Sequence, residues 1–480
     1  MRICDLKPES VFGFFAEISA IPHGSGNTEG LADYCMEFAK KRNLKAVKDS
    51  GGNVIIFSEG TNGREKSESV ILQGHLDMVC EKNPDCALDM QSEPITLCTD
   101  GNYIWADGTT LGGDDGIAIA YILAVLDDPS VPHPPIEAVF TRDEEIGMLG
   151  AAELDFSNIT GKRLINIDSE EEGVFTVSCA GGITAHCRVP LSSAKSGCTL
   201  CALEIEIGGL TGGHSGTDIG KNRQNAAKLM GSLLEYINNN AEIGIAHVLS
   251  GGKTNVIPQS AAALICADKN NADLIKNTVY DFYEAIQRKM PEEPSLTVSV
   301  SDAAMPDTLT DTNGTRKLID ALINIPNGVR AVSPETDGMA ETSLNLGILR
   351  ADADTLDTDC LIRSNTENGK RLTMRCLKEF IAGIGGDISF SADYPSWEYR
   401  NVSPLRDIMT EVYEKMYAAP PRIEAIHAGL ECGLFADKIA DIDMVSIGPD
   451  IENIHTPRER MSVASVARTW NFLLKILEKM

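Results

Sequence analysis

The sequence has no apolar run long enough to span a membrane. Its longest, from Ile117 to Leu126, is far shorter than the roughly 20 residues that a membrane-spanning helix needs. The N-terminal stretch MRICDLKPES also has no long apolar segment ahead of a small-residue cleavage site, so no secretory signal is expected. These absences predict a cytoplasmic protein with no membrane partner.

Basic stretches and a disulfide pattern are lacking as well. The chain carries 70 acidic against 42 basic residues, a net charge of −28, and such a field repels nucleic acid and anionic membranes. The 13 cysteines are scattered and odd in number, which is typical of buried small apolar residues in an intracellular chain. We expect no nucleic-acid partner and assign the cysteines no catalytic role.

Length and composition indicate a globular protein of more than one domain. A chain of 480 residues is too long for one ordinary hydrophobic core. Apolar residues make up 43% and charged residues 23%, which excludes a disordered or fibrous chain.

Strands alternate with helices in the N-terminal part. The predicted strands are Asn53–Ser58, Ser69–Leu76, Ile136–Thr141 and Arg163–Ile167. Residues 116–126 are apolar all round, as in a helix buried against a sheet. This pattern predicts an α/β fold with a mostly parallel sheet flanked by helices, whose ligands gather outside the carboxyl ends of the strands.

Three of these strands end in residues that bind metals or transfer protons. The endings are 74–77 (GHLD), 143–145 (DEE) and 168–170 (DSE), and a fourth acidic pair, Asp114-Asp115, lies in the loop TLGGDDG. Imidazole and carboxylate groups are ligands of zinc. Two zinc ions bridged by one carboxylate and one water need about five protein ligands and a separate general base.

Spacing divides these residues further. His75 and Asp77 are two apart, so on a strand they point to the same side, and Asp77 can orient the His75 ring. Of the adjacent pair Glu144 and Glu145, one can bind metal while the other takes a proton from water.

Several blocks together resemble the signature blocks of the di-zinc exopeptidases, a family that includes carnosinases, aminoacylases, peptidase T and peptidase D. These blocks are GHLDMV at 74–79, LGGDDGIA at 111–118, TRDEEIGMLGA at 141–151 and INIDSEEEG at 165–173. The last two, with HAGLECG at 427–433 and IENIHTPRER at 451–460, most resemble the peptidase D branch of aminoacyl-histidine dipeptidases. The resemblance runs in order over nearly the whole chain.

This resemblance implies a set of five metal ligands. Asp114 would bridge two zinc ions, for which Co²⁺ or Mn²⁺ could substitute. His75 and Asp168 would bind one ion, and Glu145 and His455 the other.

The resemblance also implies two catalytic residues. Asp77 would orient His75, and Glu144 would be the general base. Asp115 remains an alternative to Asp114 as the bridge, although the family block favours Asp114.

The position of His455 suggests an inserted domain, because it lies 287 positions after Asp168. Residues 185–395 show a strand-helix-strand-strand-helix-strand pattern that recurs, which suggests a duplication. We predict a catalytic domain of residues 1–184 and 396–480 and an inserted α+β lid of residues 185–395, with an antiparallel sheet covered by helices on one face. The resemblance implies a homodimer, with pairing through the lid.

Four further residues are candidates for substrate binding. His214, in LTGGHSG, could stabilise the oxyanion, and Asn255, in NVIP, could hold the substrate's backbone. Arg363, in CLIRSN, could bind a carboxylate, or form an ordinary salt bridge within the lid. Glu431, in GLECG, could bind the free amine.

The function expected from these residues is hydrolysis of unblocked dipeptides, including Xaa-His dipeptides such as β-alanyl-histidine. A tripeptidase, an aminoacylase and a carboxypeptidase of the same chemistry are alternatives, and a non-catalytic peptide-binding protein is a more distant one. No GxSxG elbow is present, and the glycines at 112–113 lack the lysine of a phosphate loop. A serine hydrolase and a nucleotide-binding protein are therefore disfavoured.

Overall fold

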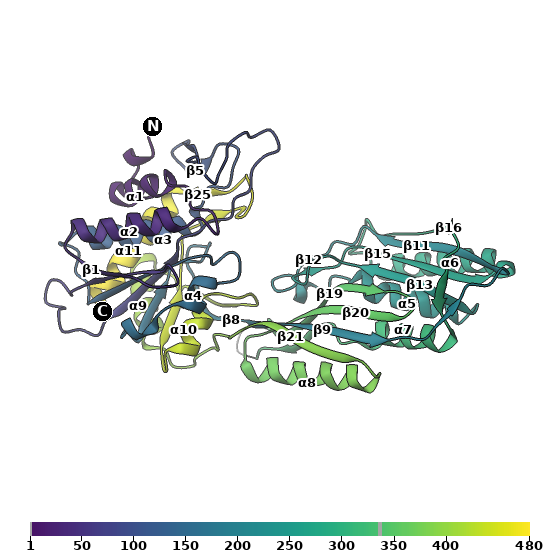
Figure 1. Ribbon diagram of the computed structural model, residues 1–480. Helices are drawn as coiled ribbons and strands as arrows, with labels where there is room; N and C mark the ends of the chain where they lie inside the picture. Colours follow the sequence, from purple (N-terminus) through teal and green to yellow (C-terminus); the bar gives the residue numbers. More distant parts are fainter. Residues whose placement is uncertain (1, 335–337) are drawn as a thin grey trace. The chain divides into compact units, whose positions relative to one another are not determined.

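The computed structural model describes residues 2–334 and 338–480 (Figure 1). The chain forms two compact units. The first comprises Met1–Ser178, Tyr399–Ala425 and Leu430–Met480, and the second comprises Cys179–Glu398 and Ile426–Gly429. Among the described residues, no helix combines the length and the apolar character needed to cross a bilayer.

The first unit is built on an eight-stranded sheet with the order β1-β2-β6-β3-β7-β23-β8-β22. Its strands are β1 (Lys45–Lys48), β2 (Val54–Ser58), β3 (Val70–His75), β6 (Ile136–Thr141), β7 (Arg163–Asn166), β8 (Val174–Cys179), β22 (Arg422–Ile426) and β23 (Asp443–Ser446). The central strands β6, β3, β7 and β23 are parallel, as predicted. Strands β1, β2 and β8 pair antiparallel, so the sheet is mixed at its edges.

Helices cover both faces of this sheet, and they are α1 (Glu9–Ser19), α2 (Glu29–Lys41), α3 (Gly113–Asp127), α4 (Leu149–Glu153), α9 (Pro404–Tyr417), α10 (Cys432–Lys438) and α11 (Val463–Lys479). In Figure 1, α1, α2 and α3 lie above the strands and α10 lies below them. Helix α3 is buried on all sides from Gly116 to Leu126, which confirms the prediction for this segment. The rings of Tyr121 on α3 and Trp470 on α11 stack at 6.0 Å.

The second unit contains a long antiparallel sheet with the order β16-β11-β15-β13-β19-β20-β9-β21, and β18 pairs with β19 beside this path. Its strands are β9 (Gly181–Pro190), β11 (Leu200–Gly208), β13 (Ile243–Ser250), β15 (Ala261–Asp268), β16 (Thr297–Ala303), β18 (Gly328–Val332), β19 (Ala340–Ala351), β20 (Thr355–Ser364) and β21 (Asp387–Tyr394). Its helices are α5 (Ala226–Asn238), α6 (Ala272–Lys289), α7 (Thr312–Asn324) and α8 (Glu367–Gly383).

The predicted duplication is present in this sheet. The first repeat is β11-α5-β13-β15-α6-β16, and the second is β9-α7-β19-β20-α8-β21. Equivalent strands occupy mirror positions in the strand order, and β13 pairs with β19 where the repeats meet. The whole first repeat is inserted between β9 and α7, an arrangement that the sequence pattern did not reveal.

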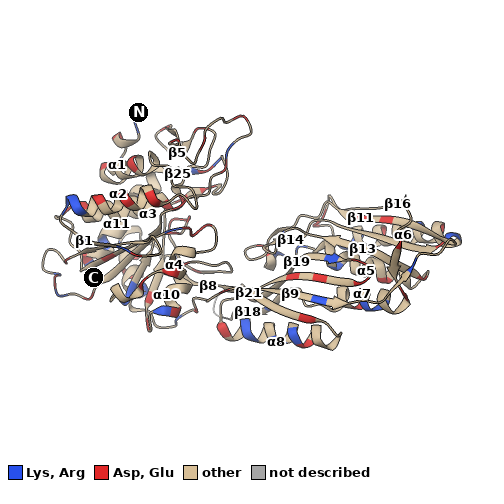
Figure 2. Cartoon of the chain, in the orientation of Figure 1, with Lys and Arg blue, Asp and Glu red and all other residues tan. Residues whose placement is uncertain are grey.

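The helices of the second unit pack on one face of its sheet, as predicted. Apolar residues of α5, α6, α7 and α8 form one core cluster with alternate residues of the strands. Along α8, a run of basic residues lies between two acidic residues (Figure 2). The smaller elements are η1 (Ile3–Asp5), β4 (Leu97–Thr99), β5 (Tyr103–Ala106), η2 (Phe156–Asn158), β10 (Ser193–Lys195), β12 (Gly213–His214), η3 (Ile219–Lys221), β14 (Val256–Ile257), η4 (Lys269–Asn271), β17 (Thr308–Thr310), β24 (Ile451–Glu452) and β25 (Arg460–Ser462).

Candidate metal centre

The carboxyl ends of three adjacent strands converge in the first unit. Strand β3 lies between β6 and β7 and is parallel to both, so the residues that follow the three strands meet at one edge of the sheet. His75 is the last residue of β3, Glu144 and Glu145 follow β6, and Asp168 follows β7. Parallel pairing thus brings together residues that are far apart in the sequence.

Asp114, at the beginning of α3, faces two histidines with its two carboxylate oxygens. Its Oδ1 lies 3.0 Å from Nε2 of His75, and its Oδ2 lies 3.2 Å from Nε2 of His455. Asp168 Oδ1 is 3.5 Å from the same His75 nitrogen, and Glu145 Oε1 is 2.8 Å from that of His455. The five residues form two sets of potential metal-ligand atoms, here called donor groups. One contains His75 and Asp168, the other contains Glu145 and His455, and both share the Asp114 carboxylate.

Asp115 points toward the backbone of the neighbouring strand. Its Oδ2 accepts a hydrogen bond from the His75 N–H at 3.0 Å. A Cβ atom at Gly74 would lie 2.6 Å from this oxygen, so glycine is required for the close approach. Metal-binding atoms of Asp115, His75 and Asp168 also lie within 4.8 Å of one another, so Asp115 could contribute to the His75 group. Of the residues that the structure describes, only Asp114 has carboxylate oxygens within 3.5 Å of both histidine rings.

Asp77 contacts both His75 and the segment that follows β6. The Nδ1 of His75 lies 2.9 Å from the Asp77 carbonyl oxygen and 3.4 Å from its carboxylate. The Asp77 carboxylate also accepts hydrogen bonds from the N–H groups of Glu144 (2.8 Å) and Glu145 (3.3 Å). Asp77 therefore holds a ligand on one side and the proposed base on the other.

The donor set fits a divalent cation in each group. A carbonyl oxygen can only accept, so Nδ1 of His75 carries the proton and the lone pair of Nε2 faces Asp114 and Asp168. Lone pairs and carboxylates that face one another need a cation between them. Ligand atoms at about 2.0–2.1 Å from a tetrahedral zinc ion lie roughly 3.3 Å apart. The 2.8–3.5 Å separations between the histidine nitrogens and carboxylate oxygens are close to this value.

The pKa values of His75, His455 and Asp168 are raised, which means that the cluster is stabilised by added positive charge. Hydrogen bonds to Asp114 and Glu145 raise the pKa of His455 to about 11. Burial lowers the pKa of His75, but hydrogen bonds to Asp114, Asp168 and Asp77 outweigh it and raise this pKa well above its ordinary value. Burial raises the pKa of Asp168 to about 6, although His75 opposes the change. A metal ion would supply this charge in place of protons on the histidines.

Glu144 is a carboxylate beside the cluster that the two donor groups leave unused. Among the described residues, none forms a hydrogen bond or ion pair with its side chain. Burial raises its pKa well above the ordinary value, and His75 partly offsets this effect. A carboxylate with an elevated proton affinity beside a metal centre suits proton transfer.

Glu431 is close to the cluster but fully enclosed. Its Oε2 accepts hydrogen bonds from Gln73 Nε2 (2.5 Å) and Thr141 Oγ1 (2.6 Å), and its exposed fraction is 0%. Burial raises its pKa to about 7. Through its Oε2, Glu431 links the neighbouring strands β3 and β6, whereas its Oε1 has no hydrogen-bond partner among the described residues. Its role as the group that binds the substrate's amine stays a prediction.

The other three candidates lie together in the second unit. Nε2 of His214 is 3.4 Å from Nη2 of Arg363, and the strand carrying His214 pairs with Val256, next to Asn255. Arg363 is buried and donates to the Tyr394 hydroxyl at 2.8 Å. Among the described residues, no carboxylate forms an ion pair with Arg363, so the alternative of an ordinary salt bridge is not supported. Asn255 is exposed, and its carbonyl accepts from the Ser215 N–H.

Ser25 also belongs to the site, although no sequence pattern indicates it. Its hydroxyl donates to the Asp77 carboxylate at 2.7 Å, and the N–H of Gly26 donates to Asp143 at 2.6 Å. The segment PHGSGN at 22–27 has the glycines of a tight turn, but nothing local in it indicates which carboxylates it contacts.

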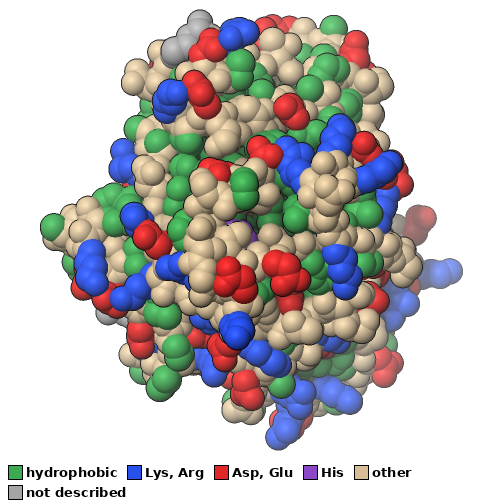
Figure 3. All heavy atoms as spheres, turned by 90° about the vertical axis from the view of Figure 1, so that its left-hand side faces the viewer, with side chains coloured by type: hydrophobic (Ala, Val, Ile, Leu, Met, Phe, Trp, Pro, Cys, Tyr) green, Lys and Arg blue, Asp and Glu red, His purple; other side chains and the backbone are tan. Residues whose placement is uncertain are grey.

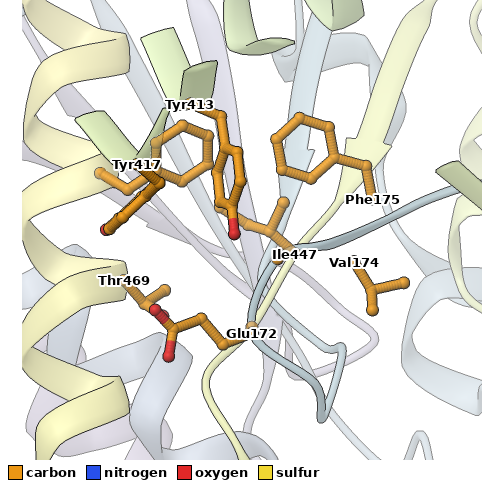
Figure 4. A pocket seen from close by; sticks show the side chains of 10 residues that line it. Glu172, Val174, Phe175, Tyr413, Tyr417, Ile447 and Thr469 are labelled. Atoms are coloured by element: carbon orange, nitrogen blue, oxygen red, sulfur yellow. The ribbon is translucent and has the colours of Figure 1, made fainter. Parts of the chain in front are cut away.

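Other surfaces and cavities offer weaker sites. Acidic, basic and apolar side chains are interspersed on the face in Figure 3. A small cavity elsewhere in the first unit is lined by Phe175, Tyr413, Tyr417 and Glu172 among others, and contains none of the predicted site residues (Figure 4). In the described part of the chain no cysteine forms a disulfide bond, and this includes Cys198 and Cys201, which have CxxC spacing near the start of β11.

Two donor groups that share a carboxylate, at the carboxyl edge of an α/β sheet, are characteristic of dinuclear metallohydrolases. The chain belongs to peptidase family M20/M25/M40, whose family model matches residues 71–479. It is 35% identical to the cytosol non-specific dipeptidase of Escherichia coli, over 100% of this chain and 99% of that protein.

Solved structures agree with this assignment. Aminoacylhistidine dipeptidase from Vibrio alginolyticus matches with a TM-score of 0.92 and 34% identity, over 100% of this chain and 98% of that one. Aminopeptidase PepT from Bacillus cereus has a TM-score of 0.60 at 15% identity, over 99% of both chains, and shares the fold. The predicted family and fold class are therefore confirmed.

Proposed function

We propose that the chain is a metal-dependent dipeptidase that hydrolyses unblocked dipeptides, including Xaa-His dipeptides such as β-alanyl-histidine. The observation that carries this proposal is the position of Asp114, whose two oxygens face two separate histidine–carboxylate pairs while Glu144 remains uncommitted beside them. The full-length similarity to two dipeptidases supports the choice of substrate.

In this proposal His75 and Asp168 hold one ion, and Glu145 and His455 hold the other, with Asp114 as the bridge. We propose Zn²⁺ for both positions, because the ligands combine imidazole and carboxylate groups, with Co²⁺ or Mn²⁺ as possible substitutes. When bound, the ions would polarise the scissile carbonyl and lower the pKa of an attacking water.

The protein's own groups then orient the reactants and move the proton. Glu144 takes a proton from the attacking water on its carboxylate and passes it to the nitrogen of the departing amine. Asp77 keeps the Nε2 lone pair of His75 directed at the centre, and its hydrogen bond to the Glu144 N–H fixes the backbone of the base.

Three residues of the second unit are proposed to bind substrate. A buried guanidinium without a carboxylate partner among the described residues supports Arg363 as the group that binds the substrate's carboxylate. His214 would donate to the developing oxyanion, and Asn255 would bind the substrate's backbone. Burial and the positive charge of Arg363 lower the pKa of His214, which favours a neutral imidazole.

We further propose that the first unit is the catalytic domain, predicted at 1–184 and 396–480, and that the second is the lid, predicted at 185–395. The division of the chain into two units supports this assignment. A homodimer formed through the lid is proposed from the sequence resemblance, and light scattering tests it. A cytoplasmic location is proposed from the name of the E. coli relative.

The experiment that tests the function compares three substrates with zinc-loaded protein. β-Alanyl-histidine should be cleaved, whereas an N-acyl amino acid and a tripeptide should be poor substrates. A preference for the acylated compound would indicate an aminoacylase, and a preference for the tripeptide a tripeptidase. Binding of peptides without turnover would indicate a non-catalytic protein and would contradict the proposal.

The variant Glu144→Gln tests the mechanism. Loss of a general base should lower kcat by about 10²–10⁴-fold while the zinc content measured by metal analysis stays near two per chain. Retention of wild-type kcat would exclude Glu144 as the base.

A further inference from the structure

Glu459 places a buried carboxylate against the loop that precedes helix α3. Its Oε2 accepts hydrogen bonds from the N–H groups of Leu111 (2.8 Å) and Gly112 (3.2 Å). Its Oε1 accepts from Gly113 (2.8 Å) and, at 3.5 Å, from Asp114. Only 2% of Glu459 is exposed. The N–H groups of four consecutive residues, 111–114, therefore all donate to the side chain of Glu459, which is distant in the sequence.

These donors have no partner of their own in helix α3. The first N–H groups of a helix lack intrahelical acceptors, and the residue at the N-cap position, Gly112, has no side chain to accept from them. Gly112 has a left-handed φ of 67°, and a Cβ there would lie 2.8 Å from the sulfur of Met78. The loop thus depends on glycine for its shape and on Glu459 for its hydrogen bonds.

The same loop sets the position of the proposed bridging ligand. Asp114 directly follows Gly113 of this loop. Its backbone, at φ −81° and ψ 104°, is not helical, so the helical hydrogen bonds of α3 do not fix the position of Asp114. Because the N–H groups of Gly113 and Asp114 bond to Glu459, the backbone that carries the Asp114 carboxylate is held against that side chain.

Glu459 also belongs to the segment that carries the other ligand, His455, four residues earlier between β24 and β25. His455 has a left-handed φ of 58°, a conformation that residues with a side chain rarely adopt unless their surroundings impose it. The N–H of Glu459 bonds to the Thr456 carbonyl at 3.0 Å, which closes the turn after His455. One residue is therefore attached to both ligand segments.

We propose that Glu459 is a positioning residue that fixes the separation of Asp114 and His455, and thereby the geometry of the ion shared by Asp114, Glu145 and His455. This inference rests on the proposed function, because it assigns Glu459 a role in the same centre. Both carboxylate oxygens of Glu459 accept hydrogen bonds from backbone N–H groups, so Glu459 supports the metal ligands and is not one of them.

The test is Glu459→Gln, which keeps the size of the side chain but turns an NH₂ group toward backbone donors. Glu452→Gln is the matched control: it lies on the same segment, is 41% exposed, and bonds to Arg460 and Tyr103. Glu459→Asp, which retains the charge on a shorter side chain, is the conservative variant.

Metal binding is measured first, by titrating metal-free protein with zinc against a competing chelator. One of the two zinc equivalents should bind about 10–100-fold more weakly in Glu459→Gln, as for other residues that orient metal ligands. Glu459→Asp should lie between Glu459→Gln and wild type, and the control should match wild type. The absorption spectrum of the Co²⁺-loaded protein should change in Glu459→Gln, and kcat should fall more than KM rises.

Two results would overturn the inference. One is wild-type affinity for both zinc ions and an unchanged Co²⁺ spectrum in Glu459→Gln. The other is a lower melting temperature of the metal-free protein with normal metal binding, which would make Glu459 only a helix cap. If Glu459→Gln does not fold, Glu459→Asp decides by the same readouts. Failure of the proposed function is seen separately, as wild-type protein that binds two zinc ions but does not cleave dipeptides.

Discussion

The two adjacent aspartates at the start of α3 have different surroundings. Asp114 directs one oxygen toward each histidine, whereas Asp115 is buried and accepts from the His75 backbone. Burial raises the pKa of Asp115 well above its ordinary value, while hydrogen bonds from His455 and His75 overcome burial at Asp114 and lower its pKa. The pKa values of these adjacent identical residues thus shift in opposite directions, because only Asp114 lies within hydrogen-bond distance of the two histidine rings.

The variant Asp114→Ala should lose both metal ions and activity together, because each donor group loses a shared oxygen. The loss of metal affinity should exceed the roughly 10–100-fold typical of residues that only orient ligands. Asp115→Asn should keep two ions. Metal analysis after dialysis measures the zinc content of both variants. Two retained zinc ions in Asp114→Ala would identify Asp115 as the bridge.

His427, in the second unit, predicts a pH dependence of stability. Its Nδ1 donates to Asn365 Oδ1 at 2.9 Å, and its Nε2 accepts from the Ser343 hydroxyl at 2.8 Å. Burial, with the charge of Arg363, lowers its pKa to about 3. The unfolded chain binds a proton near pH 6.5 that the folded chain does not, so stability is present above this pH and declines as the pH falls toward 3.

Acidification from pH 6.5 to 5 should therefore cost about 2 kcal/mol through His427. His427→Gln should remove this part of the decline, and Ser343→Ala, which keeps the titrating ring, should retain it. Urea unfolding of metal-free protein at both pH values measures the difference. An equal decline in His427→Gln and wild type would contradict the assignment.

At the scale of elements, the site depends on close contacts between segments that follow neighbouring strands. Gly448 follows β23 and Ser169 follows β7, and these strands are parallel neighbours. A Cβ atom at Gly448 would lie 1.5 Å from the Ser169 carbonyl oxygen, next to Asp168. Because the obstacle is backbone, no side-chain rotation can relieve it.

Gly448→Ala should thus destabilise the first unit by about 1–3 kcal/mol and weaken metal binding through the displacement of Asp168. Gly13→Ala in α1 is the control, since no atom lies within 4 Å of the added methyl group and alanine favours a helix. Thermal unfolding and zinc titration measure both effects. Wild-type behaviour of Gly448→Ala would show that the strand ends can separate without cost.

At the scale of the whole molecule, the proposed ions should stabilise the fold. Asp114, Glu145 and Asp168 lie close together with little exposure, and their mutual repulsion is relieved when cations bind. A ligand at 100 times its Kd stabilises the folded state by about 2.7 kcal/mol.

Removal of the metal with excess chelator should abolish activity and lower the melting temperature of the first unit by roughly 5–10 °C. Added zinc should restore both. The second unit, which contributes no residue to the donor groups, serves as an internal control in calorimetry. An unchanged melting curve after complete metal removal would contradict a structural contribution of the ions.

Much of this protein could be predicted from sequence alone. The parallel strands, the buried helix and the duplicated α+β segment were predicted because apolar periodicity and turn residues are local signals. The strand endings that contain His75, Glu145 and Asp168 were identified because parallel strands bring their carboxyl ends to one edge of the sheet, so position along each strand implies proximity. Asp114 lies in a loop, and the family resemblance implied its choice over Asp115 and the choice of Glu145 over Glu144 as a ligand. His455 was found through the family resemblance, since its loop has no local signal of metal binding.

Only the tertiary structure decided which groups meet across the fold. The structure shows that Asp114 faces the histidines whereas Asp115 contacts the His75 backbone, and that Glu431 is buried. It also shows that Ser25 bonds to Asp77 and that Glu459 bonds to the loop before α3. It also showed that one repeat of the second unit is inserted within the other. Backbone periodicity determines which side of an element a residue occupies, but the partner of a buried polar group depends on how distant loops close, and no local pattern encodes that closure.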